Sequence, residues 1–328
     1  MKDEPTEFVT WRTFCGVRIL VAGLLLVGFA TGCSIKRVAV NHLGNVLASG
    51  GTTFTSDDDP ELVRAAIPFS LKLMEGLLAE SPGHKELLRA TCSGFVQYAY
   101  AFVQQDADEL EDRDLAAATE LRARAKKLYL RARDYGLRGL EVGRPGFRRN
   151  FYSNPHAALQ RMKRSDVPLL YWTGASWGAA IALAKDDPQL LGETPLMEAL
   201  IYRALELDEA FGKGAIHTFL ITYEMSRRAD GSNPAERARA HFDRAIELSE
   251  GSLAAPLVAY AEAVCVQQQD VRTFRKLLEQ ALALDVNARP QHRLENLLFQ
   301  RRARWLLSKE ADLFLMPEKQ GQKNANDN

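Results

Sequence analysis

The chain has 328 residues, of which 46% are hydrophobic and 26% are charged, a composition typical of a packed globular protein with one large domain or two ordinary ones. Its 42 Lys and Arg residues balance its 42 Asp and Glu residues, so no basic excess indicates binding to nucleic acid or to an anionic membrane surface. The four cysteines, Cys15, Cys33, Cys92 and Cys265, form no CxxC pair and are too few for a disulfide framework.

The first predicted element, residues 1–32, has the features of a lipoprotein signal peptide. Residues 19–30 form an apolar run that is shorter than the ~20 residues a helix needs to cross a bilayer. The sequence ATGC, which ends at Cys33, resembles the bacterial lipobox. We therefore predict lipidation of Cys33 as the first residue of the mature chain, with an uncleaved membrane anchor as the alternative. Either reading places most of the chain in the periplasm, and Ser34 after the cysteine favours the outer membrane.

The mature chain, residues 33–316, is predicted to be helical throughout and to form one domain. Asp59 is the predicted N-cap of a helix, with Pro60 at its first position and Glu61 in its first turn. Apolar residues recur at spacings of three and four in several later stretches, and no convincing run alternates as a strand would. The tail, residues 317–328, has no large apolar residue and is predicted to be disordered.

Five predicted helix ends share one pattern, in which a small residue precedes Leu or Ile and the helix then stops. The small residues are Gly76, Gly139, Ala204, Ala245 and Ala281. Steps of 41 residues from Ala204 to Ala245 and of 36 from Ala245 to Ala281 are close to the period of stacked helical hairpins. The sequence therefore predicts an all-α fold, a TPR-like array of helical hairpins similar to an α-solenoid.

Motifs of known chemistry are missing from the sequence. It contains no GxSxG, HExxH, GxxxxGK[ST] or GxGxxG, and its six histidines do not pair at metal-ligand spacing. The run Asp57 to Asp59 lacks the spacing of a calcium loop and is better explained as a helix cap. We therefore expect neither an enzyme nor a bound metal or cofactor.

Three stretches combine aromatic and polar side chains, and these could line a ligand-binding cleft. They are residues 93–102, 171–180 and 214–224, and a helix core with satisfied hydroxyl and imidazole groups explains each of them equally well. In the second stretch, YWTGASWGAA, the small residues Gly174 and Gly178 predict a seam with a neighbouring helix. The predicted ligand-binding residues are Gln97, Tyr98, Tyr171, Trp172, Trp177, His217 and Tyr223.

Several longer strings carry a family resemblance over residues 33–316. PFSLKLMEGLLAESPGHKELLRATCSGFVQYAYAFV, YWTGASWGAAIALAKDDP and RALELDEAFGKGAIHTFLITYE resemble the T component of TPR-protein-associated TRAP transporters. The resemblance implies a non-catalytic periplasmic lipoprotein of TPR-like hairpins with additional helices, assembled as a homotrimer pierced by pores. It also implies a partner, the periplasmic solute-binding protein of the same transporter, whose ligand is a hydrophobic solute or an organic acid. The alternative is a TPR-like lipoprotein scaffold for envelope assembly without a small-molecule ligand.

Overall fold

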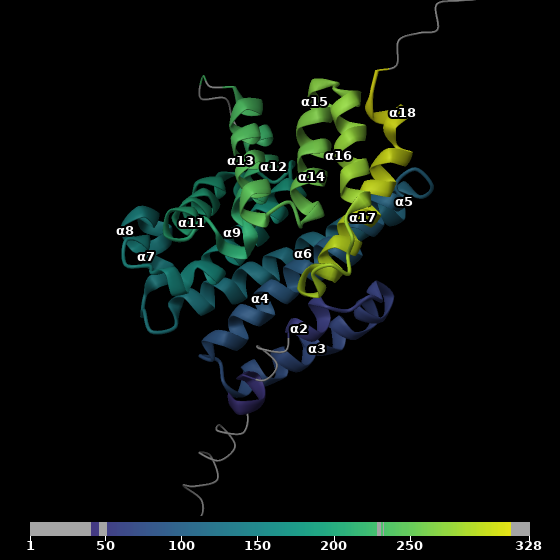
Figure 1. Cartoon of the computed structure of the whole chain (residues 1–328). Helices are drawn as coiled ribbons and strands as arrows, with labels where there is room; N and C mark the ends of the chain where they lie inside the picture. The colour runs from purple at the N-terminus through teal and green to yellow at the C-terminus, as the bar shows by residue number, and fades with distance from the viewer. Residues whose placement is uncertain (1–40, 46–50, 228–230, 232, 316–328) are drawn as a thin grey trace, which may run out of the picture.

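The structure is a computed structural model that describes residues 41–45, 51–227, 231 and 233–315, and Figure 1 shows these residues along the chain. Within those ranges every regular element is a helix and none is a strand, so the predicted all-α fold is confirmed. The predicted signal peptide (residues 1–32), Cys33 and the predicted disordered tail (residues 317–328) lie outside the described residues.

The elements follow one another with short connections. The α-helices are α2 (Gly51–Thr55), α3 (Pro60–Glu80), α4 (Lys85–Ala99), α5 (Gln105–Leu110), α6 (Leu115–Glu141), α7 (Phe147–Ser153), α8 (Pro155–Leu159), α9 (Val167–Ala182), α10 (Pro188–Gly192), α11 (Thr194–Leu207), α12 (Ala215–Ser226), α13 (Pro234–Ser249), α14 (Ala254–Tyr260), α15 (Val266–Gln268), α16 (Val271–Ala283), α17 (Arg293–Ser308) and α18 (Glu310–Leu313). Three 3₁₀ segments, η2 (Arg164–Asp166), η3 (Phe211–Lys213) and η5 (Pro290–His292), and two π-helices, η1 (Tyr100–Gln104) and η4 (Ala261–Cys265), complete the set.

Short polar side chains fix the starts of several helices. The Asp59 carboxylate accepts hydrogen bonds from the backbone N–H groups of Glu61 and Leu62, both at 3.0 Å, in front of Pro60, as predicted. Asp270 caps α16 in the same way, accepting from the Thr273 N–H at 3.0 Å. These contacts satisfy backbone donors that the first turn of a helix leaves without partners.

The five predicted helix ends are confirmed, at the ends of α3, α6, α11, α13 and α16. Ala204, Ala245 and Ala281 are fully buried, and a Cβ on Gly139 would lie 2.7 Å from Leu169 Cδ2, so four of the five small residues allow close helix packing. Gly76 differs, because a Cβ there would meet nothing within 4 Å. Neighbouring pairs such as α12 with α13 and α14 with α16 pack together, which is consistent with the predicted TPR-like hairpins.

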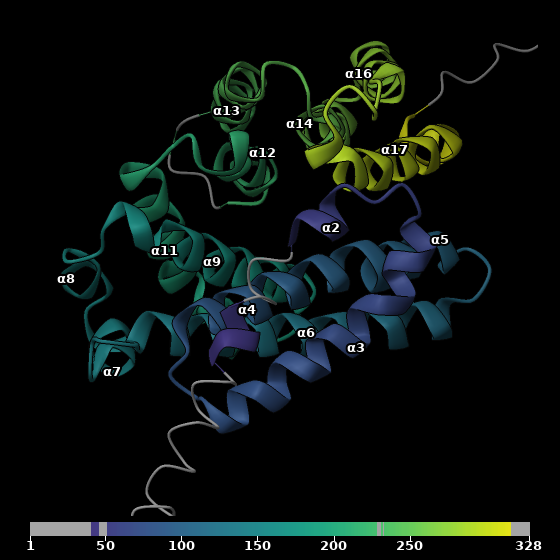
Figure 2. The ribbon, with the colours of Figure 1, turned by 60° about the horizontal axis from the view of Figure 1, so that its bottom comes forward.

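The helices enclose two main hydrophobic cores. The first core is built mainly by α3, α4, α6, α9 and α11, and the second mainly by α13, α14, η4 and α16. Figure 2 shows α17 between the helices of the second core and the group of α2, α4 and α6. Both α12 and α17 belong to the two cores, since Leu220 and Leu294 lie in the first and Ile221 and Leu306 in the second. These two helices therefore join the halves of the molecule.

Candidate functional site

The stretch Tyr171–Ala180 lies within α9, where the predicted helix seam is confirmed. A Cβ on Gly174 would lie 2.7 Å from Ile201 Cδ1 of α11, and a Cβ on Gly178 would lie 2.9 Å from Phe219 Cζ of α12. Both distances are shorter than van der Waals contact, so the two glycines let α11 and α12 approach α9 more closely than larger residues would. Gly136 of α6 has the same role on another side of α9, because a Cβ at this position would collide with the Thr173 side chain.

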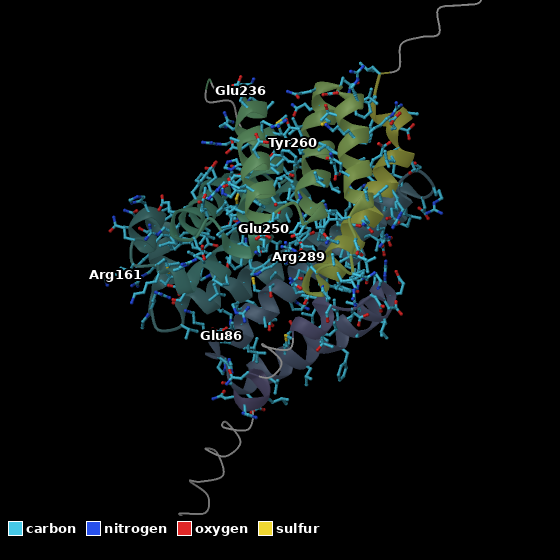
Figure 3. The ribbon with its side chains drawn as sticks, viewed as in Figure 1. Glu86, Arg161, Glu236, Glu250, Tyr260 and Arg289 are labelled. Atoms are coloured by element: carbon cyan, nitrogen blue, oxygen red, sulfur yellow. The ribbon has the colours of Figure 1, made fainter. Side chains whose placement is uncertain are left out.

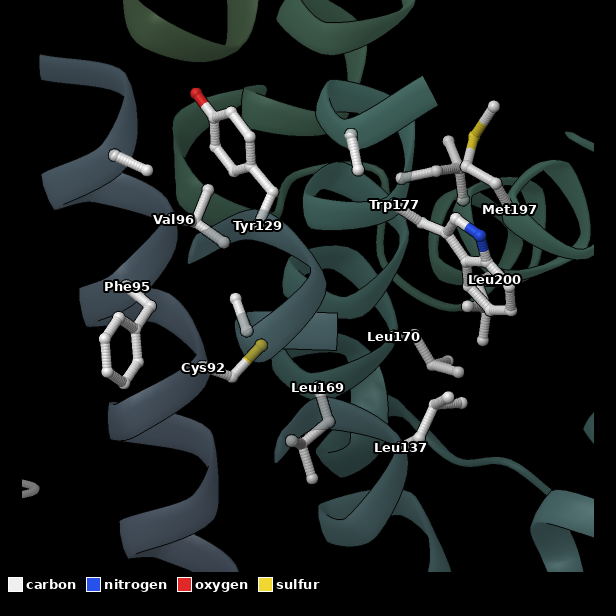
Figure 4. Close-up of a cluster of buried hydrophobic side chains, with 14 of the residues drawn as sticks. Cys92, Phe95, Val96, Tyr129, Leu137, Leu169, Leu170, Trp177, Met197 and Leu200 are labelled. Atoms are coloured by element: carbon white, nitrogen blue, oxygen red, sulfur yellow. The ribbon is translucent and has the colours of Figure 1, made fainter. Parts of the chain in front are cut away.

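Trp177 packs inside the first core. Its side chain is fully buried, and Figure 4 shows it beside Met197 and Leu200 of α11. Its indole Nε1 donates a hydrogen bond to Glu193 Oε2 at 2.9 Å, while the Arg133 guanidinium lies 4.9 Å from the centre of a Trp177 ring. Each polar and aromatic part of Trp177 therefore has a partner within the protein.

Four of the other predicted ligand-binding residues have separate local surroundings. Gln97 is exposed, and its side chain bonds the Ser93 carbonyl within α4. The hydroxyl of the buried Tyr98 accepts from Arg124 at 3.3 Å, and that of Tyr223 donates to Glu198 at 2.5 Å. His217 forms a ring pair with His241.

The pair His217 and His241 lies between α12 and α13. The two Nδ1 atoms are 2.9 Å apart, and His217 Nε2 lies 3.4 Å from the Glu209 carboxylate. Burial lowers the pKa of both imidazoles, that of His241 to about 4. Because both rings are then neutral at pH 7, one Nδ1 donates to the other, while the buried His217 Nε2 has no hydrogen-bond partner among the described residues. His217 also borders a surface recess of about 500 Å³.

Tyr171 and Trp172 are the two predicted residues that the structure brings into ring contact among the described residues. Their ring centres are 4.9 Å apart, and the Tyr171 ring lies 5.3 Å from that of Phe211. Both side chains are only partly buried. Burial, and next the charge of Glu295 on α17, raises the pKa of the Tyr171 hydroxyl, so this aromatic group faces the N-terminal part of α17.

Helix α17 uses different sides for the two cores. Asn296 Oδ1 accepts from the Ala254 N–H at 2.9 Å, and Gln300 Nε2 donates to the Leu284 carbonyl at 3.0 Å, so this side is fastened to the second core. Glu295, Phe299 and Arg302 follow at helical spacing beside this side, and Phe299 also packs against the second core. We call Tyr100, Tyr171, Glu295, Phe299 and Arg302 the α17 seam.

The two π-helices meet at this seam. Tyr100 of η1 lies with its ring centre 5.8 Å from that of Phe299. Arg302 forms ion pairs with Glu262 of η4 and, at 2.9 Å, with Asp108 of α5. A π-helical turn holds an extra residue and redirects the side chains around it, a feature that is frequent at functional sites. Both π-helices thus direct a side chain toward α17.

Glu295 is the unusual charge of the α17 seam. Its side chain is 45% exposed, yet desolvation by the surrounding protein raises its pKa to about 7. Its ion-pair contact among the described residues is His292 Nδ1 at 4.0 Å, and no hydrogen bond to the carboxylate is present there. A carboxyl group that is partly exposed and weakly paired can accept a hydrogen bond from a ligand.

Comparison with known proteins identifies the family to which the chain belongs. The sequence model of the family described as TRAP transporter T-component matches residues 56–314. A protein of Treponema pallidum (strain Nichols), named only as uncharacterized, is 32% identical over 302 residues, which cover 87% of this chain and 94% of that protein. The chain belongs to the TRAP transporter T-component family. As a T-component it is an accessory of a TRAP transporter and is associated with that transporter and its solute-binding protein.

Sequence reasoning found part of the α17 seam of this T-component. It selected Tyr171 but chose Tyr98 in the stretch that also holds Tyr100, because a regular α-helix does not reveal the extra residue of η1. It did not select Glu295, Phe299 or Arg302. Their spacing of four and three residues within an otherwise amphipathic helix is the signal that could have indicated a shared face. In the ranges that the structure describes, no helix has the length and apolar content to span a membrane.

Proposed function

We propose that this T-component docks the solute-binding protein of its TRAP transporter and receives the transported solute at the α17 seam. Two observations support this proposal: the partly exposed rings of Tyr100 and Phe299 are in contact, and the partly exposed Tyr171 lies near the weakly paired carboxyl group of Glu295. Aromatic walls with a few polar groups are typical of sites for small organic ligands.

The charge of Glu295 bears on the kind of solute. In its ionised form, which is about half of the molecules at pH 7, Glu295 repels an anion, whereas an apolar molecule with a hydroxyl or amine group can donate a hydrogen bond to it. Of the hydrophobic solute and the organic acid that the family resemblance allows, the seam therefore favours the hydrophobic one. Arg302 does not offset this preference, because its guanidinium is already paired with Glu262 and Asp108.

Mass spectrometry of small molecules that co-purify with the protein tests the proposal. We expect the wild-type protein to carry an apolar solute, and Glu295→Gln and Phe299→Ala to carry at least about tenfold less. Glu86→Gln is the matched control, since Glu86 is exposed on α4 and pairs only with Arg89 among the described residues. A wild-type protein without any co-purifying solute would instead support the scaffold without a ligand.

We further propose that the T-component is a periplasmic lipoprotein anchored through Cys33, in the outer membrane rather than the inner one. The motif before Cys33 supports this proposal. The Cys33→Ser variant should no longer incorporate labelled fatty acid and should no longer partition into detergent. Unchanged partitioning of the variant would point to an uncleaved helical anchor.

A further inference from the structure

The segment of residues 142–165, which we call the basic segment, departs from the charge balance of the chain. It holds six basic residues and no Asp or Glu, while the whole chain has 42 residues of each sign. The basic residues are Arg144, Arg148, Arg149, Arg161, Lys163 and Arg164. The segment forms α7, α8 and the turns around them, at the periphery of the first core (Figure 1).

Part of this charge is neutralised within the protein and part is available. Arg144 pairs with the buried Asp166 at 2.5 Å and Arg164 with Asp208 at 2.9 Å. In contrast, the side chains of Arg149 and Arg161 are exposed, and neither has an ion pair or a hydrogen bond among the described residues. Figure 3 shows Arg161 at the outer edge of the molecule.

The basic segment also forms a recess on the protein surface. A recess of about 680 Å³ is lined entirely by residues of the segment, including Arg144 and Arg161. Its other polar side chains include Asn150 and Asn154, and Asn154 Oδ1 accepts a hydrogen bond from the Ala157 N–H at 3.0 Å. The carbonyl of Asn154 is thereby engaged, so its amide N–H groups, like the guanidinium of Arg161, offer donors to a ligand.

Tyr152 is an exposed aromatic residue of the basic segment that lies outside the lining of the recess. The Tyr152 side chain is 41% exposed, and its ring centre lies 6.0 Å from that of the buried Trp177. One side of the Tyr152 ring therefore packs against the first core. Arg149 precedes Tyr152 by three residues on α7 and shares its face of the helix. Exposed tyrosine together with arginine is the composition enriched at the centres of protein interfaces.

We infer that the basic segment is the surface on which the T-component docks an acidic face of its solute-binding protein, with carboxylate side chains of the partner entering the recess beside Arg161. This inference rests on the proposed docking function and adds to it the location and the charge of the contact. Carboxylates suit the recess because guanidinium and amide donors line it and no acidic side chain opposes them. An anionic lipid surface fits less well, because the flat surface of a bilayer would not fill the recess.

The affinity of the full-length T-component for its purified solute-binding protein tests the inference. We expect Arg149→Glu combined with Arg161→Glu to weaken binding by at least about tenfold, and the wild-type affinity to fall as salt rises from 50 to 500 mM, because exposed charges are screened. The matched control is Arg272→Glu combined with Lys276→Glu, the same change of charge on the exposed side of α16, which should change the affinity by less than about twofold.

The outcomes separate the two proposals. If the wild-type proteins do not bind each other at all, the docking function itself fails. If they bind and the Arg149 and Arg161 variant binds equally well, docking stands and the basic segment is excluded as its surface. If that variant instead loses only its adhesion to vesicles of anionic phosphatidylglycerol, the segment is a lipid contact and the inference is overturned.

Discussion

Glu295 should make the stability of the protein depend on pH in a direction opposite to that of most carboxyl groups. Its pKa is raised from 4.5 to about 7 in the folded chain, so between these values the folded state binds more protons than the unfolded state. Unfolding free energy therefore falls as pH rises through this window. We expect Glu295→Gln to raise the melting temperature at pH 8 and to change it little at pH 5, as measured by circular dichroism. A rise of equal size at both pH values would contradict the raised pKa.

Substitution of Trp177 distinguishes a structural role of this residue from a ligand-binding role. Because its side chain is fully buried and its indole N–H is bonded to Glu193, we expect Trp177→Ala to cost about 3–5 kcal/mol of unfolding free energy. Chemical denaturation of the variant measures this cost. If the folded variant kept its stability but lost the co-purifying solute, Trp177 would instead belong to the ligand site, as the sequence left open.

At the scale of single residues, the sequence shows which functional groups are present, but it does not show what surrounds each side chain in the folded protein. The stretch around Trp177 predicted both a helix seam and an adjoining pocket, and the burial of the indole arises from α11, which lies about 20 residues further along the chain. The raised pKa of Glu295 likewise depends on protein that surrounds α17 in space. Such long-range surroundings carry no local pattern, which is why Tyr171 was selected and Glu295 was not.

The seam between α9 and its neighbours predicts opposite effects for two glycine substitutions. Gly178→Leu must displace Phe219, since even a Cβ would lie 2.9 Å from its Cζ, and we expect a loss of about 1–3 kcal/mol from overpacking. Gly76→Ala, in the open position on α3, should stabilise the protein by about 0.5–1 kcal/mol through helix propensity. Thermal unfolding of both variants measures the signs. A stabilised Gly178→Leu would contradict the close packing of the seam.

The helices themselves were largely predictable because their signals are local. The cap at Asp59 and the five repeated helix ends depend on residues within a few positions of each other. The interruption of α4 by η1 and of α14 by η4 was not predicted. A π-helical turn is favoured by the contacts of the redirected side chains, such as the ion pair of Glu262 with Arg302, and these partners are distant in the sequence.

The outer side of α3 is the apolar surface that best suits contact between whole molecules. Leu62 and Phe69, seven residues apart, are 60% and 73% exposed, and Ala65 between them is exposed as well. Leu62, Ala65 and Phe69, at spacings of three and four, form a short apolar stripe that ends before the exposed Lys72 and can pack against another copy of the chain. The homotrimer implied by the family resemblance stays a prediction, and this stripe is where we expect its copies to meet.

Light scattering of the full-length protein in detergent tests this expectation. We expect the wild type to form a trimer, and Leu62→Glu combined with Phe69→Glu to reduce the protein mass in the particle to that of one chain. Leu115→Glu is the control, because Leu115 is 62% exposed at the start of α6, outside the stripe. A monomeric wild type would remove the trimer, and an unchanged trimer in the double variant would place the contact elsewhere.

Helix α17 belongs to both cores, and this determines when it can pack during folding. Arg301 of α17 pairs with Asp106 across 195 positions of the chain, and Arg293 bonds the Ser56 carbonyl across 237. Contacts of such high sequence separation form late in folding, since a long loop must close first. While the chain is being synthesised, Tyr100 and Tyr171 therefore lack the helix that covers them in the folded protein. A chain that stops before residue 293 keeps this aromatic surface open and is exposed to aggregation and proteolysis.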